Sequence, residues 1–177
     1  MFLSVKEMEL RKVRFDETFE AGQMDFSGED LQQDSPLKAD GVAEVLAHSE
    51  GEVRIQGRYT VVMTAQCDRC LKQARFPLEK SFDLFYRPAS VIARDEEVEI
   101  DEGEAEIGFY EGGGLELEDI LREQVVLALP MQRVCSEVCK GICPVCGKNR
   151  NETRCDCKIE SADNADDRWG ALRKLEL

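Results

Sequence analysis

The eight cysteines of this chain fall into four close pairs, and this grouping constrains the fold more than any other feature. Two sulfurs a few residues apart can turn toward one ion, and two such pairs complete a tetrahedron of thiolates around Zn²⁺. Gly141 and Gly147 flank one pair, where a tight turn is needed. The pattern predicts metal ligation by all eight cysteines: Cys67, Cys70, Cys135, Cys139, Cys143, Cys146, Cys155 and Cys157.

The cost of loop closure favours partners that are near in sequence. A first zinc site is therefore expected from Cys143/Cys146 and Cys155/Cys157, and a second from Cys67/Cys70 and Cys135/Cys139. The rival arrangement joins Cys67/Cys70 to Cys143/Cys146 and leaves the other two pairs free. Both expected sites are closed, with no position for water or substrate, so the two ions are predicted to be structural.

Other uses of the cysteines fit the sequence less well. The N-terminal fifteen residues lack the apolar core of a signal peptide, so a reducing, cytoplasmic setting is expected, in which disulfides are rare. A thioredoxin-like dithiol follows a strand and opens a helix, whereas Cys67–Cys70 lies between two predicted strands. A Cys–His nucleophile needs a histidine base, and the only histidine, His48, falls at a predicted strand end, which favours a surface residue over a base. We expect no enzymatic activity, with a thiol oxidoreductase as the less favoured alternative.

A long alternating stretch, Glu52 to Cys67, predicts a β-strand with one buried and one solvent-facing side. Residues 41–51 read as a preceding strand and turn, and residues 74–88 run back with apolar side chains at even positions. The prediction is an antiparallel meander from about Val42 to Tyr86, preceded by a strand around Leu10–Phe19 and a loop at 22–36. The side chains expected on the buried face of the long strand are Val53, Ile55, Tyr59, Val61, Met63 and Ala65.

One amphipathic helix is predicted at about residues 116–129, with Pro130 at its end. Short strands are expected at 98–101 and 106–110. The tail at 165–177 has Trp169, Leu172 and Leu175 at helical spacing, which suits simple packing or partner binding. The apolar stripe expected on the helix consists of Leu117, Ile120, Leu121, Val125 and Ala128.

The predicted fold class is α+β: an antiparallel meander sheet, open or curled, with one packed helix and a cysteine-rich zinc-binding C-terminal segment. Residues 1–130 form the β-rich core, including an acidic block at 91–120. Residues 131–177 form the cysteine-rich segment and amphipathic tail. A metal site that joins Cys67/Cys70 to Cys135/Cys139 would cross-tie the two parts into a single structural domain.

The net charge of −14 is unevenly distributed. The block at 91–120 holds twelve Asp and Glu against Arg94, a net of −11. A strongly basic nucleic-acid-binding protein has a different composition, so only a local basic face can attract phosphate. The acidic block itself reads as a solvated surface or as a contact for a basic protein. No apolar run approaches the ~20 residues of a membrane helix, and no membrane partner is expected.

An ordered set of motifs in this chain resembles a known family. The motifs are CDRCL at Cys67–Leu71, LALP at Leu127–Pro130, the cysteine pattern at Cys135–Asn149 and D-x-R-W-x-x-L at Asp166–Leu172. Together they resemble the YceD family of large ribosomal RNA subunit accumulation proteins. The resemblance implies a non-catalytic factor, bacterial or plastid, that supports processing or accumulation of large-subunit ribosomal RNA. Its expected partners are that RNA, a basic ribosomal protein or an RNA-processing enzyme.

Positive charge gathers around the predicted knuckles, where small zinc modules bind looped or single-stranded RNA. An alternative function is a nucleic-acid-binding zinc protein that acts in transcription, which the low net basicity disfavours. Few aromatic side chains lie nearby for base stacking, and four thiolates around one Zn²⁺ carry negative charge of their own, so both features count against direct contact with RNA. The predicted RNA or partner contacts are Arg69, Lys72, Lys140, Lys148, Arg150 and Arg154.

Overall fold

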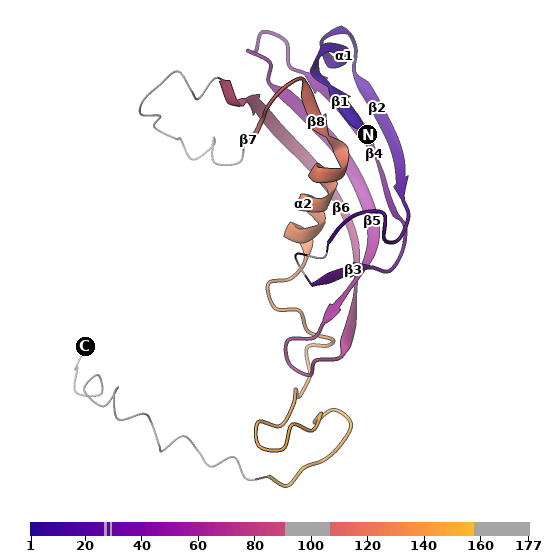
Figure 1. Ribbon diagram of the computed structural model, residues 1–177, viewed down its shortest axis with the longest axis vertical. Coiled ribbons are helices and arrows are strands. Elements are labelled where there is room, and N and C mark those ends of the chain that lie inside the picture. Colours follow the sequence, from indigo (N-terminus) through magenta and orange to yellow (C-terminus); the bar gives the residue numbers. More distant parts are fainter. Residues whose placement is uncertain (27, 29, 91–106, 158–177) are drawn as a thin grey trace, which may run out of the picture. The chain divides into compact units, whose positions relative to one another are not determined.

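The computed structural model describes residues 1–26, 28, 30–90 and 107–157 of the chain. The described residues divide into two compact units (Figure 1). The sheet unit consists of residues 1–66 and 73–133. The cysteine unit consists of residues 67–72 together with the chain from residue 134 onward, described here to residue 157.

Three consecutive antiparallel strands form the centre of the sheet unit, which confirms the predicted meander. The strands are β4 (Leu37–Val45), β5 (Val53–Gln66) and β6 (Gln73–Pro88). All the odd-numbered apolar side chains predicted for the inner face of β5 are buried. The β5–β6 hairpin is paired from Val53↔Tyr86 to Gln66↔Gln73, so its loop is the Cys67–Lys72 segment.

Further strands extend this sheet at both edges. β2 (Val13–Phe19) pairs with β4, and β3 (Leu31–Gln33) pairs with the part of β5 that lies beyond β4. β7 (Ile107–Tyr110) pairs with β6 in parallel, at one of the two positions where a short strand was predicted. The other position, 98–101, lies outside the described residues. β3 falls within the segment 22–36, so the prediction of a loop there is wrong at three residues.

The N-terminus contributes two elements that the sequence pattern did not predict. β1 (Phe2–Ser4) pairs with β8 (Gly114–Glu116), and α1 (Val5–Leu10) follows β1 directly. The predicted strand around Leu10–Phe19 therefore begins only at Val13, because Leu10 still belongs to α1. The backbone N–H of Leu117 donates to the Met1 carbonyl at 2.9 Å, which fixes the start of the next helix.

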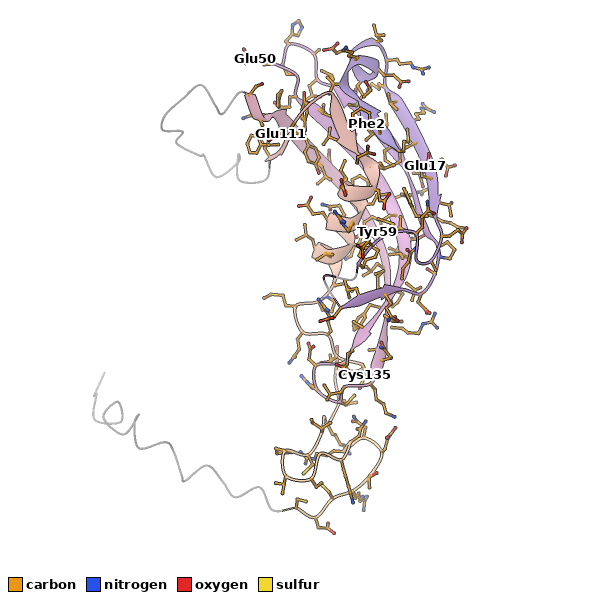
Figure 2. The ribbon with its side chains drawn as sticks, viewed as in Figure 1. Phe2, Glu17, Glu50, Tyr59, Glu111 and Cys135 are labelled. Carbon is orange, nitrogen blue, oxygen red and sulfur yellow. The ribbon has the colours of Figure 1, made fainter. Side chains whose placement is uncertain are left out.

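Helix α2 (Leu117–Ala128) confirms the predicted amphipathic helix. It lies along one face of the sheet (Figure 1), and four of its five predicted stripe residues are buried. Tyr59 on β5 points to this helix (Figure 2), and its hydroxyl donates to the Gln124 carbonyl at 2.8 Å. Burial raises the pKa of Tyr59 to about 12, so the hydroxyl remains a donor at neutral pH.

The structure thus confirms the α+β class, a largely antiparallel sheet and a cysteine-rich C-terminal region. It differs from the prediction by the second helix, α1, and by one parallel strand pair. Neither helix in the described part of the chain has the length and apolar character needed to cross a lipid bilayer. Most of the acidic block and the tail with Trp169, Leu172 and Leu175 lie outside the described residues.

Candidate metal centres

The cysteine unit contains two groups of four cysteines, and the four sulfurs of each group lie within 4.8 Å of one another. Cluster 1 consists of Cys67, Cys70, Cys135 and Cys139, and cluster 2 consists of Cys143, Cys146, Cys155 and Cys157. Sequence reasoning predicted these two groups, and the rival grouping of Cys67/Cys70 with Cys143/Cys146 is wrong. None of the eight cysteines forms a disulfide.

The loops that carry Cys67/Cys70 and Cys143/Cys146 adopt the same turn. The N–H of the first cysteine donates to the carbonyl five residues later, at 2.8 Å in both loops, where the acceptors are Lys72 and Lys148. The N–H four residues later donates back to the first cysteine, and the donors are Leu71 and Gly147. Both of these donor residues have positive φ, 60° and 70°. The two loops are therefore equivalent knuckles, although only one carries the glycine that suits this turn.

The sulfur separations suit a tetrahedral ion. A zinc ion bound at ~2.3 Å by four thiolates holds its sulfurs about 3.8 Å apart. The separation is 4.0 Å for Cys67–Cys139 and 3.7 Å for Cys70–Cys135. A disulfide requires a much shorter distance, roughly 2.05 Å. Four soft sulfur ligands at this spacing match the donor set of a structural zinc site.

Backbone amides face some of these sulfurs and favour their thiolate form. In cluster 2, the N–H groups of Cys146 and Val145 lower the pKa of Cys143 to about 6. In cluster 1, burial acts to raise the pKa of Cys67, but backbone N–H groups, first that of Cys135, outweigh it and lower the value to about 6.

The neighbouring thiols show the opposite effect. The adjacent Cys139 sulfur is the main cause that raises the pKa of Cys135 to about 12, and the Cys146 sulfur raises that of Cys157 to about 11. Four sulfurs this close cannot all carry a negative charge without a cation between them. A divalent ion relieves this repulsion in each cluster and makes all four thiolates available as ligands.

The two clusters differ in exposure. Cluster 1 has three buried cysteines and an exposed Cys135, which Figure 2 labels in the segment after α2. Cluster 2 has one buried cysteine, Cys143, while Cys146 is exposed. Cluster 1 also receives two N–H···S bonds of 3.3 Å, from the Cys135 backbone to Cys67 and from the Asn151 side chain to Cys139. The role of Asn151 has no sequence signal, because the residue is not near Cys139 in the chain.

Two of the six basic residues predicted to contact RNA instead contact other residues of the cysteine unit. The Arg69 guanidinium donates to the carbonyls of Glu137 and Cys139, at 3.2 and 3.3 Å. Lys72 forms an ion pair with Glu152. The other four, Lys140, Lys148, Arg150 and Arg154, are exposed. Exposed aliphatic side chains lie in the same unit, among them Val138 and Val145.

A mixed α+β sheet unit joined to a knuckle unit with two closed four-sulfur clusters defines a protein with two candidate structural metal sites. The family is shown by comparison with known proteins. A model of the family described as "Large ribosomal RNA subunit accumulation protein YceD" matches residues 55–176, more than half of the chain. The chain belongs to the YceD family.

One relative named after this family and two uncharacterized proteins are similar to the chain. The uncharacterized protein YlbN of Bacillus subtilis is 24% identical over 96% of this chain and 91% of its own length. The chloroplastic YCED homolog 1 of Arabidopsis thaliana is 37% identical, over 30% of this chain and 17% of its own length. An uncharacterized protein of Mycobacterium tuberculosis is 35% identical over 56% of this chain and 45% of its own length. No solved structure matches the chain.

Proposed function

We propose that this protein is a non-catalytic factor in the formation of the large ribosomal subunit, and that its cysteine unit is a zinc-stabilised docking module. The family description, which names large ribosomal RNA subunit accumulation, supports the ribosomal role. The observation that carries the docking role is the pair of closed clusters, in which every cysteine has three sulfur neighbours. A closed site leaves no open position for substrate, and this suits a structural task.

Zinc is the ion that the proposal assigns to both clusters. Its support is the all-thiolate donor set, the sulfur separations near 3.8 Å expected for a zinc tetrahedron, and the backbone amides aimed at Cys67 and Cys143. When bound, the ion supplies charge compensation and rigid cross-links, and the surrounding chain supplies orientation. The knuckle that carries Cys67 and Cys70 is thereby fixed to the segment that carries Cys135 and Cys139.

The partner we propose for the cysteine unit is ribosomal RNA. Lys140, Lys148, Arg150 and Arg154 are exposed, and long basic side chains in this state are available to phosphate. The contact is expected to be modest, because two zinc–thiolate centres carry negative charge of their own. A basic ribosomal protein or an RNA-processing enzyme is the alternative partner, for which the exposed Val138 and Val145 offer apolar contact area.

Binding of the zinc-loaded chain to large-subunit RNA is expected to weaken steeply with salt. If the four exposed cations each neutralise one phosphate of unpaired RNA, log K falls against log[salt] with a slope of about −3. The double variant Lys148→Gln/Arg150→Gln leaves two of the four cations, so its slope should be shallower, at about −1.4. The slopes are measured by filter binding at several potassium chloride concentrations.

The charge-matched control for this experiment is Lys38→Gln/Lys80→Gln, which removes two exposed cations from the sheet unit. It should leave the slope unchanged. Equal loss of slope in both double variants contradicts a local RNA-binding face. Absence of RNA binding, together with co-purification of a basic protein from cell extract, identifies the protein partner instead.

Deletion of the gene is expected to reduce mature large-subunit ribosomal RNA relative to small-subunit RNA. The measurement is a sucrose-gradient profile of ribosomal subunits with quantification of both RNAs. Re-expression of the wild-type chain should restore the profile, and re-expression of Cys67→Ser/Cys70→Ser should not, because cluster 1 then has only two sulfur ligands. Unchanged profiles after deletion contradict the proposed function.

A further inference from the structure

The loop at residues 147–154 belongs to cluster 2 in sequence but also reaches cluster 1. It connects the Cys143/Cys146 pair to the Cys155/Cys157 pair. In its middle, Asn151 donates from Nδ2 to the Cys139 sulfur of cluster 1 at 3.3 Å. The Oδ1 of the same side chain accepts from the backbone N–H of Lys140 at 2.8 Å. One amide side chain therefore contacts both a ligand of cluster 1 and the residue that follows it.

Asn151 is held in this position by the loop itself. The Oδ1 of Asn149 accepts from the backbone N–H of Asn151 at 2.9 Å and from its Nδ2 at 3.0 Å. Asn149 is half-buried and pairs with Ile142 through an isolated β-bridge. The side chain of Asn151 consequently points to Cys139 only while the loop keeps this folded conformation.

Other contacts of the same loop lead to cluster 1. The N–H of Arg150 donates to the Gly141 carbonyl at 2.9 Å, and Glu152 pairs with Lys72, two residues after Cys70. Gly141 has a positive φ of 68°, and a Cβ at this position would lie 2.9 Å from the Arg69 carbonyl oxygen. Close approach of the two knuckles at this point therefore requires glycine.

An ion in cluster 2 fixes both ends of the loop, since two of its ligands precede the loop and two follow it. Without that ion the loop is held at its ends only by the chain, and the entropy of ordering it must be offset by a few hydrogen bonds. Hydrogen bonds from outer residues to metal ligands are typically worth 10- to 100-fold in metal affinity. The bond from Asn151 to Cys139 is of this kind, and it depends on the state of the other cluster.

We propose that the two clusters load metal cooperatively and that Asn151 is the positioning residue that couples them. An ion in cluster 2 orders the loop, Asn151 then stabilises the Cys139 thiolate, and cluster 1 binds its ion 10- to 100-fold more tightly. Coupling between binding sites is reciprocal, so an ion in cluster 1 strengthens cluster 2 by the same factor. The inference rests on the proposed zinc occupancy and adds to it that the cysteine unit exists mainly fully loaded or empty.

Tryptic digestion can follow each cluster separately in the full-length chain. Residues 134–140 form one peptide, with Cys135 and Cys139, and residues 155–158 form another, with Cys155 and Cys157. The zinc-loaded protein is challenged with a chelator over a concentration series and then alkylated with iodoacetamide. Alkylation of each peptide, measured by mass spectrometry, gives the zinc affinity of each cluster. In the wild-type chain both peptides should become reactive together.

Three variants complete a double-mutant cycle. Asn151→Asp keeps the shape and the Oδ1 acceptor but replaces the N–H donor by a negative charge, and should weaken zinc at cluster 1 by 10- to 100-fold. Cys155→Ser/Cys157→Ser disables cluster 2 and should weaken cluster 1 by a similar factor. Combining the two should add almost nothing, because the loop is already free. Thr153→Ala, in the same loop and at an exposed position, is the matched control and should have no effect.

Circular dichroism of each variant tests whether the sheet unit is folded. A loss of zinc affinity is interpreted only in variants whose sheet unit is folded. Additive effects of Asn151→Asp and the Cys155→Ser/Cys157→Ser change overturn the coupling. So does an unchanged cluster 1 affinity in either variant. If the wild-type chain holds two zinc ions and the variants give either of these results, the proposed function stands and the inference alone is wrong. A wild-type chain that binds no zinc overturns the inference together with the zinc assignment.

Discussion

Removal of both metal ions with a chelator is expected to unfold the cysteine unit and to leave the sheet unit folded. The described part of the cysteine unit contains no helix or strand, and its buried apolar side chains are all cysteines: Cys67, Cys70, Cys139 and Cys143. A unit without an apolar core cannot offset the conformational entropy that folding removes. In zinc-finger peptides one structural zinc ion contributes on the order of 10 kcal/mol to folding. The cysteine unit is therefore expected to depend on its metal.

The sheet unit has an apolar core of its own. The core cluster runs from Leu3 on β1 to Leu129 just beyond α2, and every member belongs to this unit. Its largest fully buried side chains include Tyr59, Leu117 and Leu121, which join the sheet to the helix. Because these contacts use no cysteine, metal removal should affect this unit only near the ends of β5 and β6, which flank the Cys67–Lys72 loop.

Hydrogen–deuterium exchange of the full-length chain measures both units in one experiment. After chelation, peptides from 67–72 and 134–157 should exchange at the rate of an unfolded chain, while peptides from the centre of β5 keep their protection. Added Zn²⁺ should restore protection, and added Mg²⁺, which prefers oxygen ligands, should not. Retained protection at 134–157 in the metal-free chain would falsify the zinc-stabilised docking module. Loss of protection across β5 would instead support the prediction of a single cooperative domain.

The cysteine clusters could be predicted from sequence because their geometry is local. A close-spaced pair of sulfurs can reach only one ion, so the four pairs allow few groupings, and loop closure selects among them. The long strand β5 could be predicted for a similar reason, since period-two alternation over fourteen residues leaves one consistent buried face. Helix α2 was predicted from its apolar stripe. In each case the decisive information lies within one short segment.

The parts that could not be predicted depend on partners far away in the chain. β1 consists of three residues, and its strand character comes from pairing with β8, more than a hundred residues later. The Arg69 guanidinium donates to the carbonyl groups of Glu137 and Cys139, and a residue pattern does not reveal these contacts. The contact of Asn151 with Cys139 has the same character, because it requires the folded loop. Short elements and polar contacts of this type are set by tertiary structure.

A cross-strand row of two glycines and two phenylalanines leads to the second large effect. Phe15 on β2 lies opposite Gly41 on β4, Gly41 lies opposite Gly57 on β5, and Gly57 lies opposite Phe82 on β6. A Cβ at Gly41 would collide with the Gln56 carbonyl oxygen and would lie 2.5 Å from Cζ of the Phe15 ring. At Gly57 a Cβ would lie 2.8 Å from Cζ of Phe82. The two rings thus occupy the space that side chains at these glycines would need, as aromatic residues do beside strand glycines.

Gly41→Ala is expected to lower the free energy of unfolding of the sheet unit by about 3 kcal/mol or more. Overpacking a core typically costs about 1–3 kcal/mol, and here the upper end applies because the colliding Gln56 oxygen belongs to the backbone of the adjacent strand. The Cα of Gly57 lies close as well, at 2.8 Å from the new Cβ, so β4 and β5 must separate and the Phe15 ring must shift. The measurement is urea denaturation followed by circular dichroism of the zinc-loaded chain.

Gly113→Ala is the matched control, since the same methyl group is added where no heavy atom lies within 4 Å and φ is not positive. Replacing such a glycine reduces the entropy of the unfolded chain and is neutral or stabilising by up to about 1 kcal/mol. If Gly41→Ala lowers the free energy of unfolding and Gly113→Ala does not, the loss at Gly41 comes from steric collision and not from the change in chain entropy. A neutral Gly41→Ala would mean that β4 and β5 tolerate a wider separation at the glycine pair.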